Sequence, residues 1–302
     1  MSKRVALLTG ATGFVGSNLT RFLVREGWRV HVLLRSELPE FSSLSEVFGK
    51  LHPHYYDGST GSVLQCFEEA EPDIVFHLSS LYLAQHKPQD IIPLIQSNIL
   101  LGAQVLEGMA GSRTRLLVNA GTSWQHYNDE EYNPVCLYAA TKEAFEAILT
   151  YYVEAHGVRA ITLKLFDTFG PNDRRKKLFH LLRNAAAGGE QLAMSPGKQL
   201  LDLVYIDDVV QAFAVAGKRL RDGKVKGSES YALSSGNPVT LKSIAGLYGR
   251  IAKKKLNILW GGRPYRDREV MVPWTKGKKL PDWSPTVTLE EGIRKLVSLD
   301  QQ

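Results

Sequence analysis

Residues 5–26 read VALLTGATGFVGSNLTRFLVRE, and this stretch decides the fold. Val5 to Thr9 form the short, uninterrupted apolar run of a buried strand, and a helical pattern covers Ser17 to Glu26. Glycines at positions 10, 13 and 16 separate the two. Such glycines allow a tight turn and let the backbone approach a pyrophosphate at the N-terminus of the helix. The stretch therefore predicts the first βα unit of a dinucleotide-binding fold.

The rest of the first half alternates strand and helix patterns. This alternation favours right-handed βαβ units and a doubly wound parallel sheet, an α/β fold of the Rossmann type. We expect further strands at residues 29–34, 51–56, 73–80, 115–119 and 160–166. Within the strand at 73–80, His77 has apolar neighbours, and a core histidine is the favoured interpretation.

The second half of the chain predicts a smaller, mostly C-terminal substrate-binding lobe. We expect residues 1–166 to form the dinucleotide-binding domain, with 201–220 returning to it, and 167–200 and 221–302 to form mainly the lobe. In the returning segment, Leu201 to Tyr205 read as a strand and Asp207-Asp208 as the cap of a helix over 209–219. No low-complexity linker separates the two parts, so they should be interleaved.

Composition and charge exclude several classes of protein. The chain has 302 residues, of which 44% are apolar and 23% charged, as in ordinary globular proteins. It has no uninterrupted apolar run of about 18 residues and no signal-peptide core, so we expect a cytoplasmic protein without a membrane partner. Cys66 and Cys136 lack partners at metal-ligand spacing, so no metal is expected and both are taken as free thiols.

The net charge of +6 raises the question of nucleic acid. The basic clusters at 174–177, 253–255 and 276–279 are short, separated and not interleaved with aromatic residues, so solvated faces are favoured and no nucleic-acid partner is expected. A phosphorylated small ligand would exploit the same positive field.

Several side chains follow directly after predicted strands, on the edge where parallel sheets bind ligands. Arg35 and Ser36 stand about where an NAD-binding protein carries an acidic residue for the ribose 2′-hydroxyl. Because a guanidinium suits a 2′-phosphate, NADP(H) is favoured, with NAD(H) possible and an ordinary surface arginine as the alternative. Asp57-Gly58 should lie near the adenine.

A hydroxyl pair and a Tyr/Lys pair make up the candidate chemistry. Thr122 and Ser123 follow the fifth strand, and Tyr138 and Lys142 lie four apart at the start of a long helical pattern, on one face. A cation about 4 Å from the phenol would lower its pKa by about two or three units. Taken alone, the pair also fits an ordinary helix surface.

The sequence resembles the extended short-chain dehydrogenase/reductase family of nucleotide-sugar enzymes over nearly its whole length. The resemblance implies a catalytic triad of Ser123, Tyr138 and Lys142, with Ser123 preferred over Thr122 because it lies four residues before Tyr127, as in the family. The motifs that carry it, in order, are TGATGFVG at 9–16, FHLSS at 76–80, SNILLGAQVLEGM at 97–109, LKLFDTFGP at 163–171, LDLVYIDDVV at 201–210, YALSSG at 231–236, GGRPYRDRE at 261–269 and PDWSPTVTLEEGIRKLV at 281–297.

The same resemblance implies two sets of binding residues and a homodimer. The dimer would form through the helices that carry Tyr138 and Asn98, with intramolecular packing as the alternative. The implied substrate-binding residues are Thr122, Trp124, Gln125, Asp167 and the phosphate-binding Arg263. Packing is an equally good account of Trp124 and Gln125, and a surface salt bridge is the alternative for Arg263. The implied cofactor-binding residues are Gly10, Thr12, Gly13, Phe14, Val15, Gly16, Arg35, Ser36, Asp57, Gly58, Leu78, Ser79, Ser80, Asn98, Ala120, Tyr138, Lys142 and Leu165.

Departures from the family pattern narrow the expected reaction. Related 4,6-dehydratases carry an Asp-Glu pair after the catalytic Thr, whereas this chain has Trp124-Gln125, so elimination of water lacks its acid and base. A strand-end Asn of the family is Asp167 here, and a phosphate-binding Arg is Leu201, for which the basic run at 174–177 is a candidate replacement.

The expected function is NADPH-dependent reduction of the 4-keto group of a nucleotide-diphosphate-linked 4-keto-6-deoxy or 4-keto-3,6-dideoxy sugar, with Tyr138 as proton donor. The segments SWQHYN and LYAATKEAFEAIL are most similar to reductases that form CDP-linked 3,6-dideoxyhexoses. The alternatives are an NAD-dependent nucleotide-sugar 4-epimerase and, in a non-enzyme class, an NADP-sensing regulatory binding protein.

Overall fold

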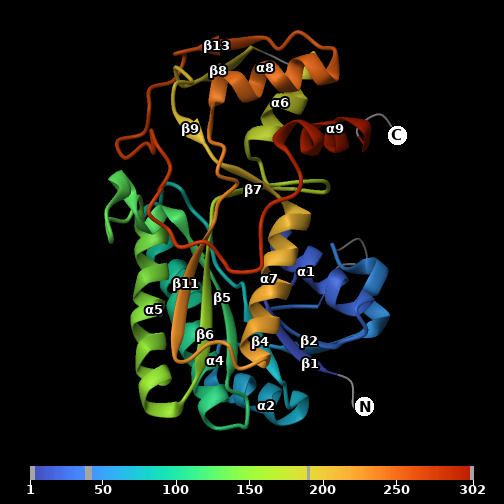
Figure 1. The fold of residues 1–302 in the computed structure, drawn as a ribbon, viewed down its shortest axis with the longest axis vertical. Coiled ribbons are helices and arrows are strands. Elements are labelled where there is room, and N and C mark those ends of the chain that lie inside the picture. Colours follow the sequence, from blue (N-terminus) through green and yellow to red (C-terminus); the bar gives the residue numbers. More distant parts are fainter. Residues whose placement is uncertain (1–3, 38–42, 189–190, 300–302) are drawn as a thin grey trace.

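The computed structural model describes residues 4–37, 43–188 and 191–299. A large part built on a parallel sheet lies below a smaller part of helices and short strands in Figure 1. The chain crosses between the two parts several times.

The large part contains a seven-stranded parallel sheet in the order β11-β6-β5-β4-β1-β2-β3. The order reverses at β1, where the chain first moves out to β3 and then returns to β4 on the other side. This is the topology of a doubly wound α/β fold, so the predicted fold class is confirmed. The strands are β1 (Val5–Thr9), β2 (Arg29–Leu34), β3 (Leu51–Tyr55), β4 (Ile74–His77), β5 (Leu116–Thr122), β6 (Arg159–Leu165) and β11 (Ser228–Leu233).

Helices cover both faces of this sheet. Residues that alternate along each strand point to opposite faces, so Leu8 and Phe76 belong to one apolar cluster and Leu7 and Val75 to the other. The first face is covered by α1 (Phe14–Arg25) and α7 (Ile206–Arg221). The second is covered by α2 (Thr60–Ala70), a continuous helical segment made of α3 (Ile91–Ile95), a π-helical turn (Gln96–Leu100) and α4 (Leu101–Ala110), and by α5 (Leu137–His156).

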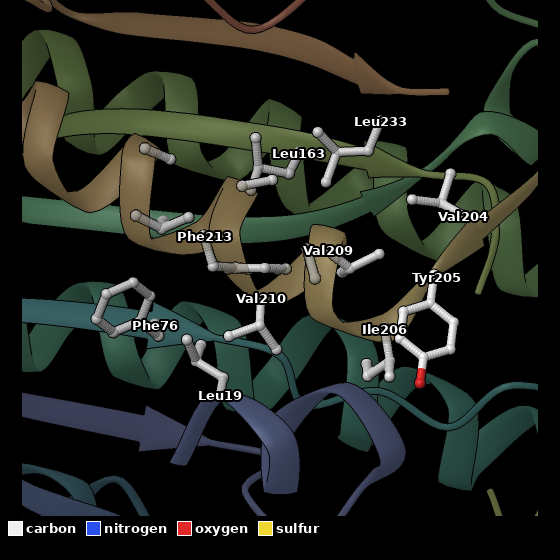
Figure 2. Packing of buried hydrophobic residues seen from close by; sticks show 14 of the residues in the cluster. Leu19, Phe76, Leu163, Val204, Tyr205, Ile206, Val209, Val210, Phe213 and Leu233 are labelled. Atoms are coloured by element: carbon white, nitrogen blue, oxygen red, sulfur yellow. The ribbon is translucent and has the colours of Figure 1, made fainter. Parts of the chain in front are cut away.

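Helix α7 lies at the centre of the first cluster, where Phe213 and Val210 pack toward Phe76 of β4 and Leu19 of α1 (Figure 2). Helix α7 therefore packs on the main sheet rather than in the smaller part. The strand before it, however, splits into β9 (Leu200–Leu201) and β10 (Leu203–Tyr205), and β10 pairs with β7 (Asp167–Phe169) in a separate two-stranded sheet.

The predicted helix cap at Asp207-Asp208 is wrong. The helix begins at Ile206, its N-cap is Tyr205 without a side-chain hydrogen bond, and both aspartates lie in the first turn. Asp208 is buried and accepts hydrogen bonds from the Thr286 amide and hydroxyl and from the Val287 amide. Its carboxylate therefore anchors the C-terminal segment to α7, a partner 78 residues away that local sequence rules do not anticipate.

The smaller part packs over the carboxyl ends of the main strands (Figure 1). We expected residues 221–302 to form mainly the smaller lobe. Strand β11 lies within this range, but it pairs with β6 in the main sheet. The remaining elements of the smaller part are α6 (Leu178–Ala186), β8 (Leu192–Met194), β12 (Val239–Thr240), α8 (Leu241–Ala252), β13 (Ile258–Trp260) and α9 (Leu289–Leu299).

One helical segment, Pro88–Ala110, is long and apolar enough to cross a membrane by length and composition. Its inward side chains, including Leu94, Leu101 and Val105, are buried, and Leu101 and Val105 belong to the cluster that joins α4 to the sheet and to α5. It is thus a core helix of this fold. Elsewhere in the core His77 is 1% exposed and its Nδ1 lies 2.9 Å from the Thr9 hydroxyl, which confirms a structural core histidine.

Candidate active site

The glycine turn between β1 and α1 is too tight for side chains. Gly10 has φ +71°, and a Cβ there would lie 2.7 Å from the backbone of Leu78. A Cβ on Gly16 would lie 2.0 Å from the Gly10 carbonyl oxygen. The backbone is therefore bare where α1 begins at Phe14, and the free amides of the first helical turn suit an anion such as a pyrophosphate.

A cavity of about 640 Å³ lies on one side of this turn. It is lined by the residues predicted at the ends of β2 and β3 and by Glu37, which we did not predict from the sequence. Glu37 lies three residues past β2, so an acidic group and a guanidinium share this cleft. The predicted residues on it are Gly10, Thr12, Gly13, Arg35, Ser36, Asp57, Gly58, Leu78, Ser79 and Ser80.

A second cleft, of about 210 Å³, continues from the glycine turn toward α5. It brings together the carboxyl ends of β4, β5 and β6 with the start of α5, as expected for ligand-binding residues of a parallel sheet. The predicted residues on it are Gly10, Gly13, Phe14, Val15, Gly16, Leu78, Ser80, Ala120, Thr122, Ser123, Trp124, Tyr138, Lys142, Leu165 and Asp167.

Tyr138 and Lys142 lie in the first two turns of α5 and are 8% and 2% exposed. Phe145 and Leu149 continue the same buried face, as the spacing predicts. Both polar side chains are thus held by the packing of the helix on the sheet, and both line the second cleft.

We expected a nearby cation to lower the pKa of Tyr138. This expectation is wrong for the protein without a bound ligand. Burial raises the pKa of Tyr138 to about 12, and side-chain hydrogen bonds to Ser80 and Thr122 oppose this only in part. Burial also lowers the pKa of Lys142 to about 8, with Glu146 acting in the other direction. The cost of placing either charge in this dry site outweighs the attraction that the sequence spacing suggests. Tyr138 therefore keeps its proton at neutral pH.

Both hydroxyls at the end of β5 face the site, in different ways. Thr122 hydrogen-bonds Tyr138 and accepts the Trp124 amide at 3.3 Å, so it also begins the short turn that follows the strand. Ser123 is half-buried and lines both the second cleft and the larger cavity beyond it. Ser123 is thus placed between the cleft that continues from the glycine turn and the cavity that extends into the smaller part.

Asn98 does not line either cleft at the glycine turn. Its side chain is 1% exposed and bonds the Leu81 amide, the Leu81 carbonyl and the Thr141 hydroxyl. The π-helical turn that contains it aims the amide at both segments. The predicted cofactor contact is therefore corrected to a supporting role, in which Asn98 ties the loop after β4 to α5.

Gln125, predicted as a sugar contact, is fully buried and lies outside the cavities. Its Oε1 accepts the Thr122 amide at 3.0 Å, while its Nε2 donates to Glu143 and Glu146 of α5. The prediction is wrong because the side chain turns inward, where it joins the end of β5 to the catalytic helix.

A cavity of about 580 Å³ adjoins the second cleft, is the larger of these two adjoining spaces, and extends into the smaller part. Trp124, Asp167 and Arg263, which we predicted as substrate-binding residues, line this cavity. Tyr82, Arg266 and Trp274 also line it, and sequence reasoning missed them. Only the fold brings these three beside the strand ends. An RPYRDRE stretch with two further arginines was the one available signal for Arg266.

Two cations of the 174–177 run lie where this cavity meets the second cleft. Arg175 bonds both carboxylate oxygens of Asp173 and stacks over the Phe14 ring at 4.5 Å. The Lys177 ammonium lies 4.5 Å from the centre of the Tyr82 ring, and burial lowers its pKa. The junction next to the start of α1 thus holds a guanidinium and an ammonium together with the carboxylates of Asp167 and Asp173.

The sequence profile of the NAD dependent epimerase/dehydratase family matches residues 6–231, which include the glycine turn, the β5 hydroxyls and the Tyr138 helix. The chain belongs to this family. It is therefore an NAD(P)-dependent enzyme of the extended short-chain dehydrogenase/reductase type.

Relatives of this epimerase/dehydratase chain cover nearly all of it. A CDP-abequose synthase from Yersinia pseudotuberculosis is 28% identical over 275 residues, which are 91% of this chain and 93% of the relative. A solved UDP-glucose 4-epimerase from Thermotoga maritima superposes with a TM-score of 0.84 at 20% identity, over 98% of each chain. A UDP-glucuronic acid 4-epimerase from Bacillus cereus, solved with UDP-glucuronic acid and NAD, has a TM-score of 0.82 at 20% identity, with 98% of this chain and 99% of that one covered.

Proposed function

We propose that this protein reduces the 4-keto group of a nucleotide-diphosphate-linked 4-keto-6-deoxy or 4-keto-3,6-dideoxy sugar with NADPH. The observation that carries the proposal is the buried Tyr138 in the second cleft, together with Ser123, which lines both that cleft and the larger cavity. The similarity to the CDP-abequose synthase and the nucleotide sugars named for the other relatives support this substrate class.

A bound nicotinamide dinucleotide supplies the hydride for such a reduction. Tyr138 donates the proton to the carbonyl oxygen. Burial raises its pKa, so it is protonated at neutral pH but is a weaker acid than a solvated phenol. Ser123 hydrogen-bonds the same oxygen, and Lys142 adds positive charge on the buried face of α5. Gln125 is an amide held by the Thr122 backbone and two glutamates, so it provides no acid or base for loss of water.

The substrate's diphosphate is assigned to the cationic wall of the larger cavity. Arg263 is exposed at its rim, and Arg175 and Lys177 lie at its inner end. Leu201 lines the same cavity, so these cations take the place of the arginine that the family carries at that position. A guanidinium and an ammonium in a partly buried cavity attract a diphosphate more strongly than fully solvated cations do, because the effective dielectric constant is lower there.

The test of the proposed reaction is consumption of NADPH, followed at its near-ultraviolet absorbance, with a panel of nucleotide-linked 4-keto sugars. A protein that binds NADPH but reduces no member of the panel contradicts the proposal. A 4-epimerase is the second candidate, supported by the fold shared with NAD-bound 4-epimerases. It predicts NAD released on denaturation and interconversion of epimers without net oxidation.

Reduction should lose rate as the pH rises through about 8, because Lys142 then loses its proton while Tyr138 keeps its own. Below that pH both groups are protonated and the rate should level off. The check is the pH profile of kcat/KM between pH 6 and 10. In Lys142→Arg the cation persists over this range, so its profile should lack the alkaline limb. If kcat/KM of Lys142→Arg falls with rising pH as in the unaltered protein, the alkaline decrease belongs to a group other than Lys142.

Arg35 and Glu37 should decide between the two dinucleotides. Arg35→Asp removes the cation suited to a 2′-phosphate and should weaken NADPH binding about tenfold or more, because a charged hydrogen bond is worth about 1.5–3 kcal/mol. Glu37→Gln removes the charge that repels the same phosphate and should strengthen NADPH binding. Fluorescence titration with NADPH and NADH measures both.

Arg29→Asp is a matched control for that pair, since Arg29 is exposed at the opposite end of β2. It should leave both affinities unchanged. Tighter binding of NADH than of NADPH by the unaltered protein would favour the epimerase and assign the ribose contact to Glu37.

A homodimer through the helical segment 91–110 and α5 completes the proposal. Both elements expose apolar side chains, with Ile92 68% and Tyr151 61% exposed. Unpartnered apolar surface of this kind marks protein contacts.

The free thiols Cys66 and Cys136 are consistent with the reducing cytoplasm, the compartment we assign.

A further inference from the structure

The larger cavity ends in the smaller part, at the loop of residues 195–199 between β8 and β9. Ser195 and Gln199 line this end and do not line the second cleft, whereas Ser123 and Trp124 line both spaces. A ligand that reacts at Tyr138 and fills the cavity therefore places its other end at this loop. On the proposed function, that end is the base of the nucleotide.

Gln199 presents an unpaired acceptor at this loop. Its side chain is 6% exposed, and its Nε2 donates to the Ser195 hydroxyl at 2.9 Å. Its Oε1 is buried and has no hydrogen-bond partner in the part of the chain that the structure describes. A buried amide oxygen left unpaired costs about 1–3 kcal/mol, so a ligand donor that reaches it gains correspondingly.

Ser195 supplies a donor beside that acceptor. Its oxygen accepts the Gln199 amide, so its own proton is available to a ligand, and the described residues contain no acceptor for it. Gln199 and Ser195 together present an acceptor next to a donor on one wall of the cavity. The nearby Met194, Leu200 and Leu241 give apolar surface for the faces of a planar ring.

The backbone holds this pair in place before any ligand binds. The Gln199 carbonyl accepts the Leu241 amide at 3.0 Å, and the Gly197 carbonyl accepts the Lys242 amide at 3.1 Å, so the first turn of α8 fixes the loop. The Lys198 amide donates to the Tyr265 hydroxyl at 3.1 Å. A site held by several such bonds discriminates between ligands better than a mobile one.

We propose that Gln199 and Ser195 select a base that carries an amino group beside an unprotonated ring nitrogen. Gln199 Oε1 accepts from the amino group, and the Ser195 hydroxyl donates to the ring nitrogen. Cytosine and adenine present this edge. Uracil, thymine and the O6/N1 edge of guanine present a carbonyl beside a ring N–H, which reverses both hydrogen bonds. In the orientation that the structure gives the Gln199 amide, its buried oxygen would then face another acceptor.

The experiment titrates the protein, saturated with NADPH and in parallel with NADH, with CDP, ADP, UDP and GDP in a calorimeter. Saturation keeps ADP out of the dinucleotide cleft. CDP or ADP should bind about tenfold tighter than UDP and GDP, a ratio that corresponds to about 1.4 kcal/mol. Whichever of the two binds tighter identifies the ring that the cavity accommodates.

Gln199→Leu should weaken binding of the preferred nucleotide about tenfold and change the affinity for UDP by no more than about twofold. The variant should therefore have no preference among the bases. Ser195→Ala, which deletes only a hydroxyl, tests the same pair if Gln199→Leu does not fold. Gln191→Leu is the matched control, because its amide is exposed in the same part of the chain and bonds Asn257 instead. Thermal unfolding verifies each variant.

Tighter binding of UDP or GDP than of CDP and ADP by the unaltered protein would overturn the inference, as would a preference that survives both substitutions. Binding of nucleoside diphosphates requires no turnover. Failure of every 4-keto sugar assay with the CDP or ADP preference intact would therefore refute the proposed reaction alone. Reduction of a UDP-linked sugar with equal preference for UDP would refute the base selection alone.

Discussion

Tyr138→Phe is expected to lower kcat for reduction of a nucleotide-linked 4-keto sugar by about 10²–10⁴-fold, the range for loss of a positioned proton donor. The ring stays in its buried site on α5, and only the hydroxyl that bonds Ser80 and Thr122 is removed. NADPH affinity should change little, because the glycine turn and the cleft beside Arg35 are untouched. Stopped-flow reduction and fluorescence titration measure the two quantities.

Tyr152→Phe is the control for this substitution. Tyr152 lies on the same helix, and its hydroxyl donates to Glu107 at 2.8 Å, away from both clefts. It should retain the full rate. A rate for Tyr138→Phe within about threefold of the unaltered protein would remove Tyr138 as the donor. Full biological activity of Tyr138→Phe without turnover would instead support the regulatory NADP-binding alternative.

Lys164→Met is expected to lower the free energy of unfolding by about 3–5 kcal/mol, the cost of leaving a buried charge without its partner. Lys164 is 4% exposed and lies 3.1 Å from Glu146 and 3.6 Å from Glu143. Burial already raises the pKa of Glu146, and the lysine opposes that shift. Urea unfolding at pH 8 measures the loss.

Two further variants separate this cause from lost packing. Adding Glu146→Gln to Lys164→Met removes the unpaired carboxylate and should restore most of the stability. Lys218→Met breaks an exposed pair with Asp222 on α7 and should have little effect. Because Glu146 binds a proton more readily once Lys164 is gone, the loss in Lys164→Met should shrink as the pH falls from 8 to 5. An equal loss at both pH values would assign it to packing.

The ion pairs of Lys164 with Glu143 and Glu146 also explain why the site could be only partly predicted. Gln125 lies next to Trp124 in the sequence, and both were taken as sugar contacts. In the fold Trp124 lines the cavity, while Gln125 turns inward to two carboxylates that Lys164 compensates. The choice between the two directions depends on buried charges from β6 and α5, which are distant in sequence from residue 125.

Local physics made much of the rest predictable. The glycine turn, the parallel strands and the Tyr138/Lys142 face follow from spacing within a few residues, and the structure has all three. Asp208 shows the limit of such rules, because an aspartate near a helix start reads as a cap. Its actual partners, Thr286 and Val287, come from the other end of the chain.

The sequence by itself determined the fold class, the family resemblance and the residues at the strand ends, because periodicity and glycine spacing are local properties. Only the tertiary structure decided the ionisation of those residues. Burial raises the pKa of Tyr138 and lowers that of Lys142, the reverse of what a neighbouring cation would do to a solvated phenol. It also decided which polar atoms lack partners, since the unpaired oxygen of Gln199 depends on the loop that encloses it.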